Sequence, residues 1–164
     1  MTLIDDPHYV CPLKQDILLT DMVLSDLNEV VEQRWNIKPL SPSTSSDQTF
    51  FSGHVLFNRR CIVLLPVKGT SGTYLDVPFI VDTGSPYTYL SRRSLQSLHK
   101  QLPDQEQSFV LIHKTRVKVY ESPPKSHFAD FNILGGDFFE ASQFVLSVNF
   151  SAFSVKLVIE NDDL

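Results

Sequence analysis

The chain has 164 residues, of which 42% are hydrophobic and 20% are charged, and its formal net charge is -5. This length and apolar content suit one globular domain, with room for an extension. A net negative chain lacks the clustered Lys and Arg that contacts with phosphate require, so nucleic acid is not an expected partner. Twelve Phe and five Tyr, together with many Val and Ile, favour β-structure.

The N-terminus has no basic region ahead of an apolar stretch, so it is unlike a secretory signal. No run approaches the roughly 18 apolar residues needed to cross a bilayer, and no membrane partner is expected. Cys11 and Cys61 lack metal-ligand spacing and are predicted to be reduced thiols, with a single bridge between them left open. None of the five histidines has a partner at metal-ligand spacing, and each is predicted to lie on the surface or in a loop. The expected location is the cytoplasm.

The first third of the chain predicts a helical extension. Apolar residues recur at helical spacing over residues 16–35. Residues 38–48 are rich in Ser and Pro and predict a flexible linker. We therefore predict an N-terminal helical extension with its linker over residues 1–48 and a β-domain over residues 49–164. The helix is expected to pack on its own β-domain, while packing on a second subunit or on a partner stays open.

Beyond the linker the pattern changes to short runs of β-branched and aromatic residues, which predict strands. Between them lie two short helical segments, one over residues 92–98 with Ser91 as its N-cap and one over residues 137–143. The fold class is therefore mainly β, with one or two short helices and the N-terminal helical extension. The predicted strands cover residues 50–57, 61–67, 74–81, 87–90, 109–112, 116–120, 131–134, 144–150 and 155–159.

The candidate for chemistry is the segment 77–85, in which a hydrophobic strand runs into Asp82, Thr83, Gly84 and Ser85. Two carboxylates about 3 Å apart that share one proton can activate water and polarise a peptide carbonyl without a covalent intermediate. Gly84 lets the backbone approach a substrate and a second loop closely. Thr83 can join two such loops by hydrogen bonds, and Ser85 can hold the carboxylate coplanar with its partner. The same four residues also suit an ordinary turn, so by themselves they leave both possibilities open.

A second motif follows about fifty residues later, where an apolar strand runs into Gly-Gly-Asp-Phe-Phe over residues 131–139. A strand that ends in Asp-Thr-Gly-Ser, followed by Ile-Leu-Gly-x-Asp-Phe, resembles the retropepsin-like aspartic proteases of retroviruses and gypsy-class retrotransposons. The resemblance spans residues 60–159 and includes the hairpin that begins at residue 61 and the terminal hairpin over residues 144–158. It implies a closed β-barrel that forms one half of an acid protease.

The resemblance also implies a role for each matching residue. With one Asp-Thr-Gly in the sequence, a chain supplies half of the catalytic pair, and a two-fold homodimer completes it. Asp137 is expected at a helix start and not as a second catalytic carboxylate. The implied function is a homodimeric aspartic endopeptidase of retroelement type that cleaves a peptide or polyprotein, without cofactor or metal. The implied site consists of Asp82 as catalytic residue, Thr83, Gly84 and Ser85 as its loop, and Ile133, Leu134 and Gly135 in the substrate pocket, with Ile133 facing the substrate.

Two departures from the family pattern favour an alternative. Active members carry a Gly-tipped β-hairpin, the flap, between the catalytic loop and the Ile-Leu-Gly motif. Here residues 91–101 have helical character, and no glycine lies between Gly84 and Gly135. Gly136 also stands where many relatives have an Arg that supports the dimer. The alternative function is a catalytically weak or inactive retropepsin-fold module for dimerisation or peptide binding.

Overall fold

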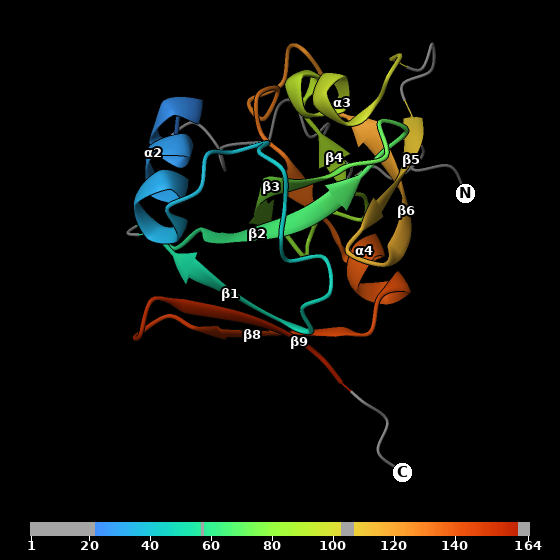
Figure 1. Cartoon of the computed structure of the whole chain (residues 1–164). Coiled ribbons are helices and arrows are strands. Elements are labelled where there is room, and N and C mark those ends of the chain that lie inside the picture. Colours follow the sequence, from blue (N-terminus) through green and yellow to red (C-terminus); the bar gives the residue numbers. More distant parts are fainter. Residues whose placement is uncertain (1–21, 57, 103–106, 161–164) are drawn as a thin grey trace, which may run out of the picture.

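The computed structural model describes residues 22–56, 58–102 and 107–160. These residues form a nine-stranded sheet with helices around it (Figure 1), so the mainly β prediction is confirmed. The helices are α2 (Leu24–Trp35), α3 (Arg92–Leu98) and α4 (Gly136–Ala141). The strands are β1 (Phe50–Val55), β2 (Cys61–Lys68), β3 (Tyr74–Val81), β4 (Tyr89–Leu90), β5 (Gln107–Ile112), β6 (Thr115–Glu121), β7 (Ile133–Leu134), β8 (Phe144–Asn149) and β9 (Ser154–Ile159).

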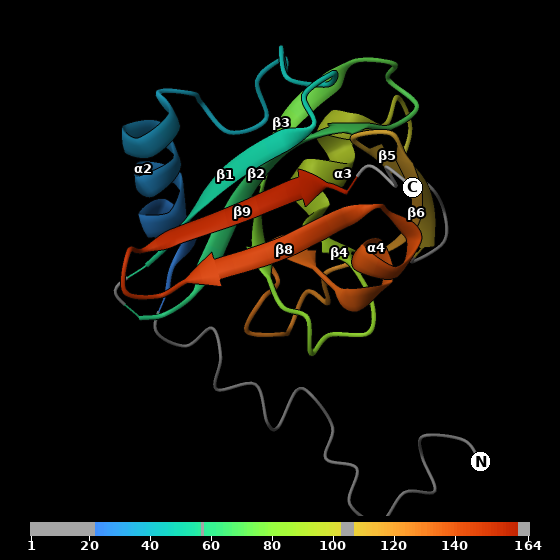
Figure 2. The same cartoon turned by 90° about the horizontal axis from the view of Figure 1, so that it is seen from below.

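Six of these strands close into a ring. The order along the sheet is β3-β7-β4-β6-β5-β2-β1-β9-β8, and an additional pairing between β2 and β3 closes the ring. Strands β1, β9 and β8 continue beyond β2, and Figure 2 shows the β8–β9 hairpin running across the lower face of the molecule. The main hydrophobic core includes Leu65, Phe79, Leu90, Leu134 and Phe138.

Strands β2 and β3 are buried on both faces, which explains their nearly continuous apolar sequences. On β3, Phe79 belongs to the main core, whereas its neighbour Ile80 belongs to a second cluster that includes residues of α2. Successive side chains of a strand point to opposite faces. Helix α2 therefore covers the outer face of β2 and β3, as expected for packing on its own domain.

The Ser/Pro-rich segment is not a free linker, because residues on it pair with β3. Leu40 N–H donates to Asp76 O at 2.8 Å, Asp76 N–H donates to Ser41 O at 2.9 Å, and Ser43 N–H donates to Tyr74 O at 2.8 Å. These bonds satisfy backbone groups along the margin of β3, which composition alone does not predict. Helix α2 begins at Leu24, and the earlier part of the predicted helix lies outside the described residues.

Two of the histidines lie in loops, as predicted, but are buried there: His99 follows α3, and His113 lies in the turn between β5 and β6. His99 and His113 are 7% and 3% exposed, and burial lowers the pKa of both imidazoles. Cys61 is a free, half-buried thiol whose pKa is raised by burial, and Cys11 lies outside the described residues. Along the stretches that the structure describes, every helix is too short or too polar to cross a membrane.

Candidate active site

Asp82 directly follows β3 and opens a tight turn. Its N–H donates to Leu134 O on β7 at 3.0 Å, and its carbonyl accepts a hydrogen bond from Ser85 N–H at 3.0 Å. The carboxylate oxygen Oδ1 accepts a further hydrogen bond from Gly84 N–H at 3.1 Å. Asp82 is half-buried, whereas Thr83 and Gly84 are exposed. The turn thus places a carboxylate at the margin of the molecule, with the next two residues accessible to another chain.

Ser85 differs from the expectation that its hydroxyl would hold the catalytic carboxylate. Its Oγ donates to Tyr87 O at 2.7 Å, and since a hydroxyl has one proton, that proton is not donated to Asp82. The carbonyl of Ser85 accepts a hydrogen bond from Gly136 N–H at 2.7 Å. Ser85 therefore fixes the shape of the loop and ties it to the start of α4.

Gly135 lies where two backbone segments cross. A Cβ at this position would overlap the Tyr87 carbonyl group, 2.5 Å from its carbon, and would lie 2.9 Å from Ser85 O. Its N–H donates to Thr88 Oγ1 at 3.1 Å. Gly135 is therefore required here for close approach of the Asp82 loop to the junction between β7 and α4.

Thr88 and Asp137 join the loop to α4, and the sequence did not single out Thr88. Thr88 Oγ1 donates to Asp137 Oδ1 at 2.6 Å, and Thr88 N–H donates to Asp137 Oδ2 at 3.1 Å. Phe138 N–H also donates to Asp137 Oδ1, at 2.8 Å. An acidic residue in a first helical turn is a common sequence feature. The sequence around Asp137 does not indicate that its carboxylate accepts hydrogen bonds from Thr88, 49 residues away.

Asn132 is a second buried positioning residue that sequence patterns missed. Its Oδ1 accepts a hydrogen bond from Ser91 N–H at 2.9 Å, and its Nδ2 donates to Pro78 O at 3.0 Å. Asn132 thereby connects β3, the approach to β7 and the N-terminus of α3. Its location immediately before Ile133 was the only hint that it belongs to the site.

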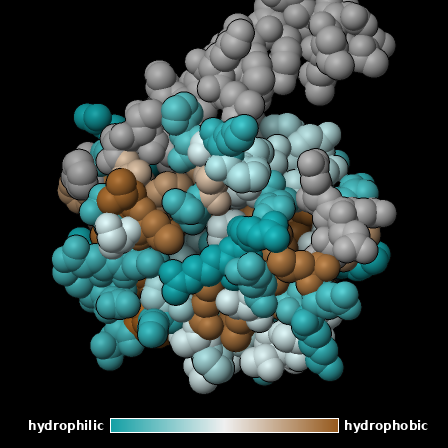
Figure 3. Space-filling view, turned by 90° about the horizontal axis from the view of Figure 1, so that it is seen from above, coloured by the Kyte–Doolittle hydropathy of each residue, from teal (hydrophilic) through white to brown (hydrophobic). Residues whose placement is uncertain are grey.

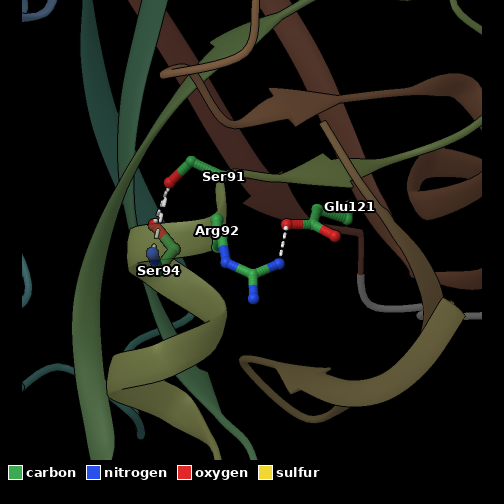
Figure 4. Close-up of polar contacts among 4 residues, drawn as sticks. All are labelled: Ser91, Arg92, Ser94 and Glu121. Carbon is green, nitrogen blue, oxygen red and sulfur yellow. Dashed lines mark hydrogen bonds and ion pairs between the residues drawn. The ribbon is translucent and has the colours of Figure 1, made fainter. Parts of the chain in front are cut away.

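The interval in which family members have a flap contains α3 instead. Among residues 91–102, α3 is the only regular element, residues 103–106 lie outside the description, and the next hairpin, β5–β6, begins at Gln107. Ser91 is confirmed as the N-cap, since its Oγ accepts a hydrogen bond from Ser94 N–H at 3.2 Å. Figure 4 shows this cap beside the 3.1 Å ion pair between Arg92 and Glu121. A capped helix fixed to β6 is a different structure from a hairpin that can close over a substrate.

The three residues predicted for a substrate pocket do not share one environment. Ile133 and Leu134 are adjacent on β7, so their side chains point to opposite faces. Leu134 lies in the main core, while Ile133 lies in the cluster beneath α2 and is 5% exposed. The structure thus places Ile133 on the outer face of the ring but covers it.

The described residues hold no group of three His, Cys, Asp or Glu side chains that could bind a metal ion. On the face shown in Figure 3, hydrophobic side chains form separate patches between hydrophilic ones.

Comparisons with known proteins give a limited result. No protein-family model matches the sequence, and no curated protein matches it. Among solved structures, the fold is similar to the crystal structure of a retropepsin-like aspartic protease from Rickettsia conorii, with a TM-score of 0.45 and 15% sequence identity. The match covers 66% of this chain and 89% of that chain. A likeness of this extent assigns no activity, so the function must be argued from the site.

Proposed function

We propose that the chain is one subunit of a homodimeric, retropepsin-like aspartic endopeptidase of retroelement type. The observation that carries the proposal is the Asp82 turn, held against β7 by the bond to Leu134 and against α4 by the bond between Gly136 and Ser85. A carboxylate on a fixed turn, followed by an exposed Thr83 and Gly84, suits the meeting of two identical loops.

In the proposed dimer, the two Asp82 carboxylates share one proton. Like charges this close cannot both ionise, so the pair titrates as a unit. The ionised carboxylate takes a proton from water, which attacks the peptide carbonyl, while the protonated carboxyl donates a hydrogen bond to the carbonyl oxygen. Gly84 N–H donates to Asp82 Oδ1, which helps to hold the carboxylate in place on the turn.

A specific observation favours the second candidate, a retropepsin-fold module with weak or no catalysis. Helix α3 occupies the place of the flap and is fixed by its cap and by the Arg92–Glu121 ion pair. A site without a closing hairpin excludes water less well and holds a peptide less firmly. In that case the Asp82 loop would serve association between chains or the binding of a peptide.

The remaining parts of the proposal concern organisation and location. The retropepsin-like domain is proposed to comprise residues 49–164, with residues 1–48 as the helical extension and its Ser/Pro-rich linker. A reducing compartment such as the cytoplasm fits the free thiol of Cys61.

Asp82→Asn tests the peptidase proposal. An amide cannot take the proton from water, so we expect cleavage of peptide substrates to fall by about a thousandfold or more, with inhibition of the wild type by pepstatin-type compounds. Asp47→Asn, which changes a fully exposed carboxylate, is the matched control and should cleave as the wild type does. Cleavage that is unaffected by Asp82→Asn would exclude this mechanism.

Mixing experiments separate the dimer from the chemistry. When wild-type and Asp82→Asn chains are mixed equally and exchange freely, about a quarter of the dimers keep two intact carboxylates. Activity per total chain should therefore fall to about a quarter of the wild-type value, whereas independent subunits would retain about half. Analytical ultracentrifugation of the same samples should show a dimer, and a strict monomer at high concentration would refute the proposal.

A further inference from the structure

An apolar surface continues directly from the Asp82 carboxylate. Ile80 N–H donates to Asn132 O, just before β7, and Asp82 N–H donates to Leu134 O on β7, so the ladder extends one residue beyond β3. Residues two apart on an extended chain share a face, which places the Asp82 side chain on the side of Ile80. Ile62 pairs opposite Ile80 on β2, and Ile133 lies beside it on β7. Three isoleucines therefore form a floor next to the carboxylate.

Aromatic side chains border this isoleucine floor. Tyr89, Phe128 and Phe131 belong to the same hydrophobic cluster, and the rings of Tyr89 and Phe128 meet edge to face with their centroids 5.2 Å apart. A floor of isoleucines with aromatic walls, beside a group that can activate water, suits large apolar side chains on either side of a scissile bond.

Helix α2 covers this floor in the structure. Met22 and Leu27 lie in the same cluster as the isoleucines and are 8% and 1% exposed, and Ile62 and Ile80 are 0% and 3% exposed. Leu24, Val30 and Trp35 pack against the margin of the cluster. The isoleucine floor is thus filled by apolar side chains from the chain's own extension.

Helix α2 and the segment that follows it are attached to the domain in different ways. Its contacts with the floor are apolar, and the side-chain bond from Gln33 to Glu29 runs within the helix. The helix ends at Asn36 in a left-handed conformation, and the segment that follows is hydrogen-bonded to β3 from Leu40 onward. A short connection over residues 36–39 therefore separates a helix docked by side chains from a segment held by its backbone. Such an arrangement permits release of the helix without loss of the strand pairing.

We infer that α2 is an autoinhibitory segment, which occupies the apolar substrate groove beside Asp82 and must leave before a peptide with large apolar residues can bind. This inference rests on the function proposed above. Docking of an amphipathic helix into an apolar groove is a common mode of peptide recognition. Here the helix is part of the same chain, so the groove is occupied without an added ligand, and the apparent affinity for substrate is reduced by the fraction of molecules that are open.

Leu27→Asp in the full chain tests the inference, because it places a carboxylate in the apolar contact between α2 and the floor. Ser25→Asp is the matched control, since it adds the same charge to an exposed position of the same helix and leaves the bond between Gln33 and Glu29 in place. The probe is a labelled octapeptide with Phe and Leu at its central bond. We expect Leu27→Asp to raise both the cleavage rate and the association constant of the probe about tenfold, and Ser25→Asp to change neither.

Hydrogen exchange reports whether the helix has opened while the sheet stays folded. In Leu27→Asp, residues 24–35 should lose protection while β2 and β3 retain it. Loss of protection in α2 with an unchanged association constant would overturn the inference. Should Leu27→Asp unfold the sheet, Leu27→Ala replaces it as a milder change, with the same association constant deciding the outcome.

Repeating the association measurements in the Asp82→Asn background separates this inference from the peptidase proposal, since binding then needs no catalysis. Tighter binding upon opening of α2, with no cleavage by any variant, would support the autoinhibitory helix and refute the peptidase. Cleavage by the wild type that opening does not increase would support the peptidase and refute the autoinhibitory helix.

Discussion

At the scale of single residues, the site depends on one position that excludes a side chain. We expect Gly135→Ala to destabilise the protein by about 1–3 kcal/mol, the usual cost of forcing an extra carbon into a packed region. The added Cβ would overlap the Tyr87 carbonyl and push the Asp82 loop away from β7. Urea denaturation measures the free energy of unfolding, and the cleavage rate of the folded variant should fall as well.

Gly136→Ala is the control for that substitution. A Cβ on Gly136 would lie 3.5 Å from Ser85 O and Thr83 O, which is ordinary contact distance. Gly136 is also the first residue of α4, where Ala is tolerated at least as well as Gly. We expect its stability to match or slightly exceed that of the wild type. Equal losses for the two variants would show that the crossing at Gly135 is not the sensitive feature.

At the scale of elements, Thr88 connects the Asp82 loop with α4. Thr88→Val keeps the shape of the side chain but removes the hydroxyl, so Asp137 loses a donor and Gly135 N–H loses an acceptor. Because these groups lie in a buried region, we expect a loss of about 1–3 kcal/mol in the free energy of unfolding and about a tenfold lower cleavage rate.

Thr88→Ser distinguishes this hydrogen-bond network from packing alone. Serine keeps the hydroxyl and removes one methyl group, which costs about 0.8 kcal/mol by burial. The variant should lose that stability yet cleave at nearly the wild-type rate. If Thr88→Val cleaves as well as Thr88→Ser at equal protein folding, the bridge to Asp137 does not position the catalytic loop.

The sequence correctly predicted those elements that depend on residues close together in the chain. The strand over Tyr74–Val81 has the predicted bounds, and Ser91 caps α3 as its sequence indicates. The burial of His99 was not predictable, because it depends on a contact between its Nδ1 and Thr70, 29 residues away in the chain. The pairing of residues 40–43 with β3 was missed because a Ser/Pro-rich composition carries no strand signal.

The same distinction applies to the candidate site. The Asp82 turn and the crossing at Gly135 follow from motifs in the sequence, and the structure brings them together through Leu134 and Ser85. The cover over Ile133 did not follow, since the spacing of apolar residues in a helix shows which face is buried but not what it covers. Sequence patterns thus indicated which segments meet at the candidate site, but not that α2 covers the isoleucine beside it.

At the scale of the whole molecule, the mildly acidic pH that favours the proposed chemistry is expected to lower the stability of the fold. A carboxylate pair that must hold one proton favours mild acid. His99 Nδ1 accepts a hydrogen bond from Thr70 N–H at 3.2 Å, and because an N–H can only donate, this nitrogen is unprotonated. Burial lowers the pKa of His99, so charging the imidazole in acid would cost that bond.

His113 and His54 act in the same direction. The ring of His113 lies between Phe51 and Phe144, and its pKa is lowered by burial and by Lys114, with opposing effects from Asp47 and from a hydrogen bond to the Gln48 backbone. The pKa of His54 is lowered by burial and by Arg34. All three native pKa values lie below the ordinary value of 6.5. Their contribution to stability is therefore complete above that pH and declines as the pH falls below it, where the unfolded chain binds more protons.

We therefore expect a lower free energy of unfolding at about pH 5 than at about pH 7.5, measured by urea denaturation at both pH values. His99→Gln, whose Oε1 can accept the hydrogen bond from Thr70, should reduce this difference, while His127→Gln at an exposed position should not. Asp76 has the opposite tendency, because burial raises the pKa of its carboxyl, and the comparison of histidine variants cancels its effect. An equal pH dependence in all three proteins would mean that the buried imidazole of His99 does not limit stability in acid.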